Sequence, residues 1–129
     1  MNYPAELKYT KEHEWAKIEE NIATMGITDY AQHALTDLVF VELPQVGKKA
    51  EQGKPLMVVE SVKNVSDVFA PVSGSVIELN KELEKHAEFV NQDPYGKGWM
   101  AKIKISNPKE LDSLMNAEDY KKFAEGQKH

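Results

Sequence analysis

The residue best placed to do chemistry in this sequence is Lys63, which lies in the run ESVKNVSD at positions 60–67. The segments 56–59 and 65–69 are rich in β-branched and aromatic residues, a pattern that predicts two strands with Lys63 in the turn between them. An ordinary lysine amine is protonated and hydrated at neutral pH, and is therefore a poor nucleophile by itself. At a hairpin tip, however, an enzyme that attaches a prosthetic group can reach it. The spacing leaves one alternative open, an ordinary polar turn lysine.

The other side chains with chemical potential form no motif. No nucleophile, base and orienting residue occur together, which disfavours a stand-alone enzyme. The sequence has no cysteine, which excludes disulfides and thiolate chemistry from the protein itself. The histidines are far apart and lack the spacing of zinc ligands, so no metal site is predicted. They are His13, His33, His86 and His129.

The composition is that of one globular domain of 129 residues. Its formal net charge is −5, and no basic cluster interrupts the sequence, which argues against a nucleic-acid partner. An acidic surface instead suits docking to basic rims on enzymes. Residues 1–4 show neither a hydrophobic signal core nor an arginine-rich presequence, and no stretch is long enough to span a bilayer. We therefore expect a cytoplasmic protein with no membrane partner.

The elements that position Lys63 are predicted to be mostly strands. Strand patterns cover residues 14–19, 22–27, 38–43, 75–80 and 98–105. The segment 38–43 is almost wholly apolar and ends at Pro44, which predicts a strand buried on both faces. Asp29 followed by Gln32 has the form of a capping box and predicts a short helix over residues 30–35.

Two helical stretches are predicted after the last strand. The segment 107–110 supplies a cap, a proline at the first helical position and a glutamate at the third, so a helix should follow over Leu111, Leu114 and Met115. Asn116 can cap a second stretch with an apolar stripe. That stripe consists of Tyr120, Phe123 and Ala124. We expect it to pack on the strands, and a partner-binding stripe is the alternative.

A series of short segments in one order carries a resemblance that spans most of the chain. These segments are 7–10 with 13–15, 26–32, 39–44, 60–63 with 66–67, 70–74, 90–91 and 93–96 with 98–99, followed by a C-terminal helical tail. In this order they resemble the glycine cleavage H-protein family. The resemblance implies a mainly β fold, a lipoyl/biotinyl-like barrel-sandwich hybrid with a short internal helix and C-terminal helices. A single carrier domain would fill residues 1–129, with its core at about 7–105 and its helical segment at about 107–125.

The resemblance also implies a function for Lys63, which would carry lipoic acid as an amide. The lipoyl group would take the aminomethyl group of glycine from glycine decarboxylase (P protein) to aminomethyltransferase (T protein). Dihydrolipoyl dehydrogenase (L protein) would then reoxidise it, and the chain itself would be a carrier without catalytic activity. A lipoate ligase or octanoyltransferase would load Lys63. Glu60 and Asp67 flank the lysine hairpin, so we expect the loading enzyme to recognise them, and solvated turn charges of little consequence for stability are the alternative.

Family members also bind the loaded arm in a surface cleft. The aminomethylated arm ends in an amine that is protonated at neutral pH, so a carboxylate in the cleft can pair with it. The cleft also excludes water, which slows the loss of formaldehyde and ammonia from the arm. The resemblance maps the cleft onto five residues of this chain. They are Glu12, Glu14, Ile27, His33 and Leu35.

Two positions depart from the family pattern. Thr36 stands where the family usually has glycine, and a positive φ angle there would strain a β-branched residue. Asn64 stands where alanine is frequent, and it extends the polar turn without removing the lysine. Two other carrier functions compete with this one. Biotin is disfavoured because Val62 and Asn64 flank Lys63 in place of methionines. A relay that donates lipoyl or octanoyl groups to 2-oxoacid dehydrogenases stays open.

Overall fold

The computed structural model describes residues 1–126, so His129 lies outside the described residues. The strands are β1 (Lys8–Tyr9), β2 (Glu14–Glu19), β3 (Ile22–Ile27), β4 (Leu38–Glu42), β5 (Lys49–Ala50), β6 (Pro55–Ser61), β7 (Val65–Phe69), β8 (Gly74–Leu79) and β9 (Ala101–Ile105). The α-helices are α1 (Asp29–Leu35), α2 (Glu88–Gln92) and α3 (Ala117–Gly126), and the 3-10 helices are η1 (Lys81–Glu84) and η2 (Pro108–Ser113).

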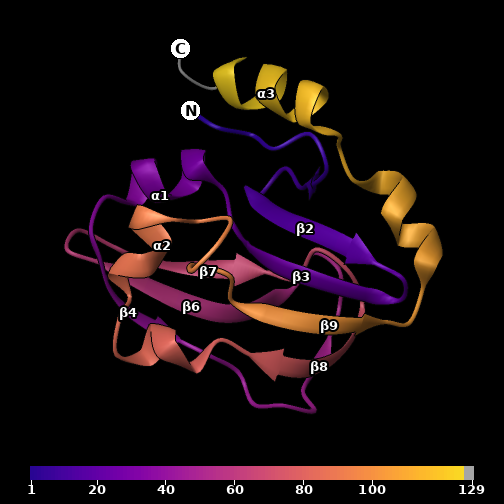
Figure 1. Cartoon of the computed structure of the whole chain (residues 1–129), viewed down its shortest axis with the longest axis horizontal. Coiled ribbons are helices and arrows are strands. Elements are labelled where there is room, and N and C mark those ends of the chain that lie inside the picture. The colour runs from indigo at the N-terminus through magenta and orange to yellow at the C-terminus, as the bar shows by residue number, and fades with distance from the viewer. Residues whose placement is uncertain (127–129) are drawn as a thin grey trace.

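The strands form two antiparallel sheets. One has the order β1-β2-β3-β9-β8-β5, and the other has the order β4-β6-β7. The larger of two apolar clusters draws side chains from both sheets, among them Met25 and Ile103 from the first and Val41, Val59 and Val68 from the second. Burial of such side chains is the main favourable term in folding. This arrangement confirms the predicted mainly β, sandwich-like fold class (Figure 1).

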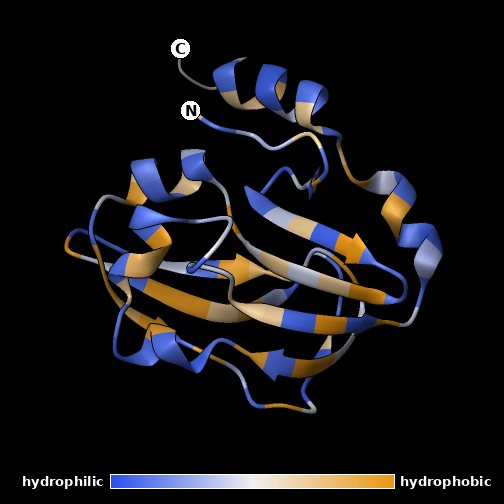
Figure 2. Cartoon of the chain, viewed as in Figure 1, coloured by the Kyte–Doolittle hydropathy of each residue, from blue (hydrophilic) through white to orange (hydrophobic). Residues whose placement is uncertain are grey.

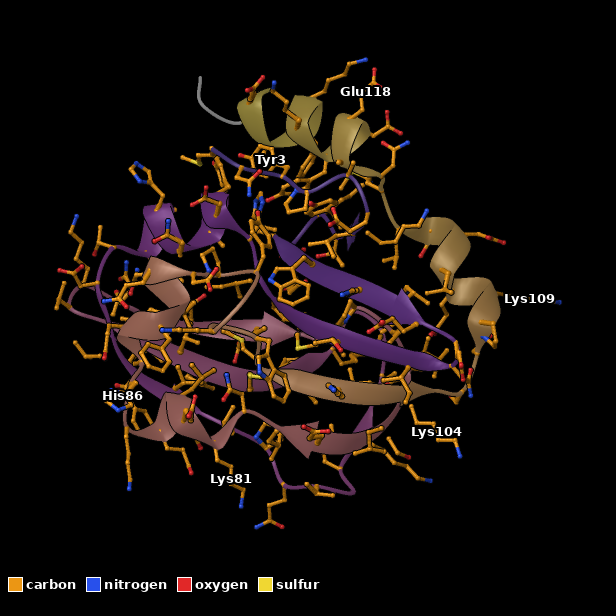
Figure 3. The ribbon with its side chains drawn as sticks, in the orientation of Figure 1. Tyr3, Lys81, His86, Lys104, Lys109 and Glu118 are labelled. Carbon is orange, nitrogen blue, oxygen red and sulfur yellow. The ribbon has the colours of Figure 1, made fainter. Side chains whose placement is uncertain are left out.

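A second, mostly aromatic cluster fastens α3 to the N-terminal segment and to β1 and β2 (Figure 1). Tyr120 of α3 stacks on Tyr9, with ring centroids 4.7 Å apart, and meets Tyr3 edge to face at 5.2 Å. Figure 3 shows Tyr3 beneath α3, on the side that faces the strands. The apolar stripe of the last helix therefore packs on the body of the protein, as the sequence predicts, and Figure 2 shows hydrophilic residues on the rest of α3.

The segment 38–42 departs from its prediction. Leu38 and Val41 are buried, but Val39 and Phe40 are 60% and 42% exposed. The pairing of β4 with β6 shifts between Leu38 and Phe40, which indicates a β-bulge. The apolar run suggested burial on both faces, and this was wrong because only one face of the three-stranded sheet meets the core.

The helix predictions hold only in part. The N-cap of α1 is Thr28, whose Oγ1 accepts from the Ala31 N–H, and the predicted cap Asp29 is instead the first helical residue. The segment after Asn107 is a 3-10 helix that ends before Leu114, whose backbone is extended, so the longer helix predicted there was wrong. Asn116 does cap α3, since its Oδ1 accepts from the Asp119 N–H at 2.8 Å.

The backbone at Thr36 has φ +63°, the left-handed conformation that its β-branched side chain disfavours. Asn91 of α2 holds this position. Its Nδ2 donates to the Thr36 carbonyl at 2.8 Å, and its Oδ1 accepts from the Leu38 N–H at 2.9 Å. The strained residue is therefore fixed between the end of α1 and the start of β4.

Candidate functional site

Lys63 lies at the exposed tip of the turn between β6 and β7, as the sequence predicts. That turn projects from the left edge of the molecule in Figure 1. Within residues 1–126 no hydrogen bond or ion pair engages its side-chain amine. The side chain of Lys63 is therefore free to take up a substituent.

The backbone of the turn, in contrast, is held on both sides. The Ser61 Oγ accepts from the N–H groups of Lys63 and Asn64 at 3.2 and 3.0 Å. The Ser61 N–H donates to the Asn64 carbonyl at 2.8 Å, which closes the turn. A residue outside the hairpin also holds the turn, since the Val62 N–H donates to the Asp37 carbonyl at 3.1 Å. A free side chain thus stands on a fixed base.

Glu60 and Asp67, the predicted recognition residues, lie on the same face of the three-stranded sheet. Val58 is two residues from Glu60 on β6 and is paired with Asp67 on β7. Alternate residues of a strand, and directly paired residues of neighbouring strands, point to one face. Asp67 is exposed and Glu60 is half-buried, so both carboxylates are accessible beside the turn.

A cleft of about 170 Å³ opens beside this hairpin. Four of the five residues predicted for the arm cleft line it, namely Glu12, Glu14, Ile27 and Leu35. Strands β6 and β7 form another wall with Val59, Ser66, Asp67 and Val68. The hairpin that carries Lys63 therefore also forms part of the cleft.

His33, the fifth predicted residue, is exposed on α1 and is not among the residues that line the cleft. Its neighbour Ala34 lines it, and the imidazole at the cleft comes from His13. The His13 ring stacks on Tyr30 with 4.6 Å between centroids, and its Nδ1 lies 2.8 Å from the Tyr120 hydroxyl. Sequence reasoning missed His13, although its position between Glu12 and Glu14 could have indicated it.

Tyr120 ties the cleft to the C-terminal helix. Its hydroxyl lies 2.8 Å from the Thr28 Oγ1 as well as 2.8 Å from the His13 Nδ1. Thr28 caps α1, which supplies another wall of the cleft. One buried hydroxyl from α3 therefore connects the turn before β2 with the start of α1.

Glu14 is the most buried acidic group of the cleft, with 2% of its surface exposed. One carboxyl oxygen accepts from the Thr10 hydroxyl at 2.5 Å, and the other accepts from the Phe69 N–H at 3.2 Å. Burial raises the pKa of Glu14 to about 7, although both hydrogen bonds oppose this shift. The carboxyl is therefore close to half-ionised at neutral pH, and a cation placed in the cleft would favour its charged form.

Within residues 1–126 no group of three or more His, Cys, Asp or Glu side chains is arranged to hold a metal ion. No helix in that range is long and apolar enough to cross a membrane.

Comparison with known proteins gives consistent matches over nearly the whole chain. The family model described as "Glycine cleavage H-protein" matches residues 7–127. Two curated relatives named "Glycine cleavage system H protein", from Symbiobacterium thermophilum and Carboxydothermus hydrogenoformans, are each 55% identical over 122 residues. These matches cover 95% of this chain and 95% and 94% of the relatives.

Solved structures agree with the sequence matches. The crystal structure of a glycine cleavage system H protein from Mycobacterium marinum superposes with a TM-score of 0.84 at 36% identity. The match covers 91% of this chain and 94% of that chain. The likeness thus extends to both sheets and is not confined to the lysine hairpin.

Proposed function

The chain belongs to the glycine cleavage H-protein family, a family of lipoyl carriers and not of enzymes, and from this we propose that Lys63 is the residue that bears lipoic acid. The observation that carries the proposal is the free, exposed side chain of Lys63 on a fixed turn that borders a cleft. Such a lysine can be acylated without disturbing the fold, because its amine has no partner to lose within residues 1–126.

The residues around Lys63 fit a lipoyl group. The turn leaves the amine open to solvent, and the neighbouring cleft has the apolar side chains of Ile27 and Leu35 for an aliphatic chain. When bound, lipoic acid supplies a cyclic disulfide that accepts the aminomethyl group of glycine at glycine decarboxylase, yields it at aminomethyltransferase and is restored by dihydrolipoyl dehydrogenase. The chain's own side chains would hold and shelter the arm between these enzymes.

The cleft would shelter the cargo, which ends in a protonated amine. Ile27 and Leu35 exclude water, and the carboxylates of Glu12 and Glu14 offer charge-assisted hydrogen bonds to the ammonium. Because Glu14 has a pKa of about 7, an ammonium beside it would shift the carboxyl toward its ionised form. Shelter from water would slow loss of the cargo between enzymes.

Glu60 and Asp67 are proposed to guide the lipoate ligase or octanoyltransferase to Lys63. Both carboxylates lie on one face beside the turn, where they can meet basic side chains of a partner. The cytoplasmic location expected from the sequence stays a prediction, which fractionation of cells that express the protein can test.

Intact-mass analysis of the chain purified from lipoate-competent cells tests the proposal. We expect a lipoyl increment that peptide mapping places on Lys63 and that Lys63→Arg abolishes. The matched control is Lys54→Arg, which changes an exposed lysine just before β6 and should retain the increment. An octanoyl increment alone would favour the relay function. Absence of any adduct in the presence of active ligase and octanoyltransferase would contradict the proposal.

A further inference from the structure

Thr10, in the segment between β1 and β2, is held against the buried carboxyl of Glu14. Its Oγ1 accepts from the backbone N–H groups of Glu12 and Glu14, each at 3.2 Å, and lies 2.5 Å from a carboxyl oxygen of Glu14, Oε1. Thr10 lines a second pocket, of about 160 Å³, and is not among the residues that line the cleft. Glu14 lines both, so Thr10 can act on the cleft through Glu14.

The direction of the hydrogen bond between the two side chains follows from the other contacts of Thr10. A hydroxyl group offers one proton and two lone pairs. The two backbone N–H groups take both lone pairs, so the proton is what remains for Glu14. A protonated Glu14 that donated to Thr10 would need a third lone pair. Thr10 is therefore the donor, and the Glu14 Oε1 is the acceptor, in both protonation states of the carboxyl.

The other carboxyl oxygen of Glu14 is held in the same way. Its Oε2 accepts from the Phe69 N–H at 3.2 Å, and a backbone N–H can only donate. Two fixed donors thus take one lone pair of each oxygen and leave the others for a proton or for a cationic N–H group. A proton added there removes both the negative charge and a position that the cationic group would use. The proton and a cation therefore compete for Glu14.

We propose that Thr10 is a positioning residue that keeps Glu14 ready to accept the ammonium of a loaded arm, so that cargo entering the cleft replaces the proton of Glu14. This inference rests on the function proposed above. No covalent bond changes in the exchange. The carboxylic acid gives its proton to water, and the carboxylate that remains forms a neutral pair with the ammonium. The Thr10 hydroxyl favours this exchange because its hydrogen bond is stronger to the ionised carboxyl.

The charges around Glu14 make the hydroxyl necessary. Burial raises the pKa of Glu14 to about 7, the hydrogen bond from Thr10 is the largest influence in the opposite direction, and the negative charge of Glu12 adds a smaller rise. Without the hydroxyl, the pKa would rise further and the proton would be harder to displace. Other titratable side chains also line the cleft or the second pocket. Among residues 1–126 they are Lys11, Glu12, His13, Tyr30 and Asp67.

The first test measures the pKa of Glu14 in the chain without lipoic acid, by carboxyl carbon NMR with Glu14→Gln to assign the signal. Thr10→Val keeps the shape of the side chain and should raise this pKa by about one to two pH units, as expected for a lost hydrogen bond to a charged group. Thr10→Ala leaves room for water in place of the hydroxyl and should give a smaller rise. Thr10→Ser keeps the donor, and Thr24→Val changes a threonine that lines neither pocket, so both should keep the wild-type value.

The second test measures how well the cleft protects the cargo. The lipoylated chain is loaded with glycine and glycine decarboxylase and is then separated from the enzyme. The rate of cargo loss, followed by intact mass from pH 5 to 9, is compared with the rate for the same chain unfolded in urea. Protection by Thr10→Val at pH 7.5 should be at least about threefold smaller than in wild type, since a rise in pKa above 8 leaves only a minor fraction of Glu14 ionised. Protection should also begin at a higher pH, and Thr10→Ser should restore both.

Three results would overturn the inference. They are an unchanged pKa of Glu14 in Thr10→Val and Thr10→Ala, wild-type protection in both variants, or an equal loss of protection in Thr10→Ser. If Thr10→Val does not fold, Thr10→Ala decides the first two. A wild-type chain that accepts the cargo but protects it no better than the unfolded chain would instead contradict the shelter proposed for the cleft. The pKa of Glu14 separates the two cases, because it is measured without the arm.

Discussion

The turn that holds Lys63 and the cleft wall that holds Glu14 are positioned by different kinds of contact. The turn is closed by Ser61 and Asn64, within three residues of each other in sequence, and Lys63 itself is exposed. Glu14 is buried, and one of its partners is Phe69, 55 residues away. The proposed carrier function needs both arrangements, since Lys63 would have to be accessible to enzymes while the cargo would have to be shielded from water.

Removal of the charge of Glu14, in the cleft, should give the largest change in the free energy of unfolding. The raised pKa means that the folded protein holds this proton more tightly than the unfolded chain does. As pH rises from about 4.3, the unfolded chain releases the proton first, so stability falls until about pH 7 and stays reduced above it.

We therefore expect Glu14→Gln to raise the free energy of unfolding at pH 8 by about 1 to 3 kcal/mol and to abolish the loss of stability between pH 4.3 and 7. Urea denaturation of both proteins between about pH 4 and 8 measures the stability at pH 8 and its dependence on pH. The exposed Glu12→Gln serves as the control and should change little. A wild-type protein whose stability rises between pH 5 and 7, with no benefit from Glu14→Gln, would contradict the assignment.

The next largest change in stability should come from Tyr120, which joins α3 to the residues beside the cleft. Tyr120→Phe removes the hydroxyl that contacts both His13 and Thr28. We expect a loss of about 1 to 2 kcal/mol in the free energy of unfolding, because two partly or fully buried polar groups lose a partner. The initial rate of Lys63 acylation, measured by mass spectrometry, should stay at the wild-type value. A large fall in that rate would show that the turn and the cleft are not independent.

The strained end of α1 should give a smaller effect of opposite sign. Thr36→Gly relieves the strain of a φ of +63°. We therefore expect the free energy of unfolding to rise by about 1 kcal/mol, after the entropic disadvantage of glycine is included. Thermal unfolding measures the change, and Thr24→Gly within β3 provides a control that should destabilise. Destabilisation by Thr36→Gly would mean that the hydroxyl contact with the Leu35 carbonyl outweighs the strain.

The smallest effect on stability belongs to the turn. Ser61→Ala removes the hydroxyl that accepts from Lys63 and Asn64, at a cost of about 0.5 to 1 kcal/mol. Faster hydrogen exchange should appear at the amides of Lys63 and Asn64 and leave those of the cleft residues unchanged. Exchange that also accelerates at Ile27 would show that the turn supports the cleft.

The sequence predicted the elements whose contacts are local. Strands on both sides of Lys63 and the hairpin at 14–27 follow from short-range patterns, and the structure has them at nearly the expected positions. The sequence also pointed to strain at Thr36 if φ there is positive, because the residue departs from the family pattern at one known position, and the structure has φ +63°. These features depend on a few consecutive residues, which a sequence displays directly.

The parts that depend on long-range packing were harder to predict. The exposure of Val39 and Phe40 depends on which face of β4 meets the core, and an apolar run looks the same in either case. His33 was placed at the cleft by resemblance, but Ala34 lines it there and His13 contributes from another element. A shift of one residue on a helix turns a side chain by about 100°, so an uncertain register moved the prediction off the cleft.

The association of Lys63 with the cleft is tested most directly by methyl NMR of the intact protein with its arm oxidised and with its arm carrying the aminomethyl group. We expect the methyl signals of Ile27 and Leu35 to shift on loading, while those of Val46 and Ile77, which lie outside the cleft, stay unchanged. If the Ile27 and Leu35 signals do not move although mass spectrometry shows full loading, the arm does not rest in this cleft.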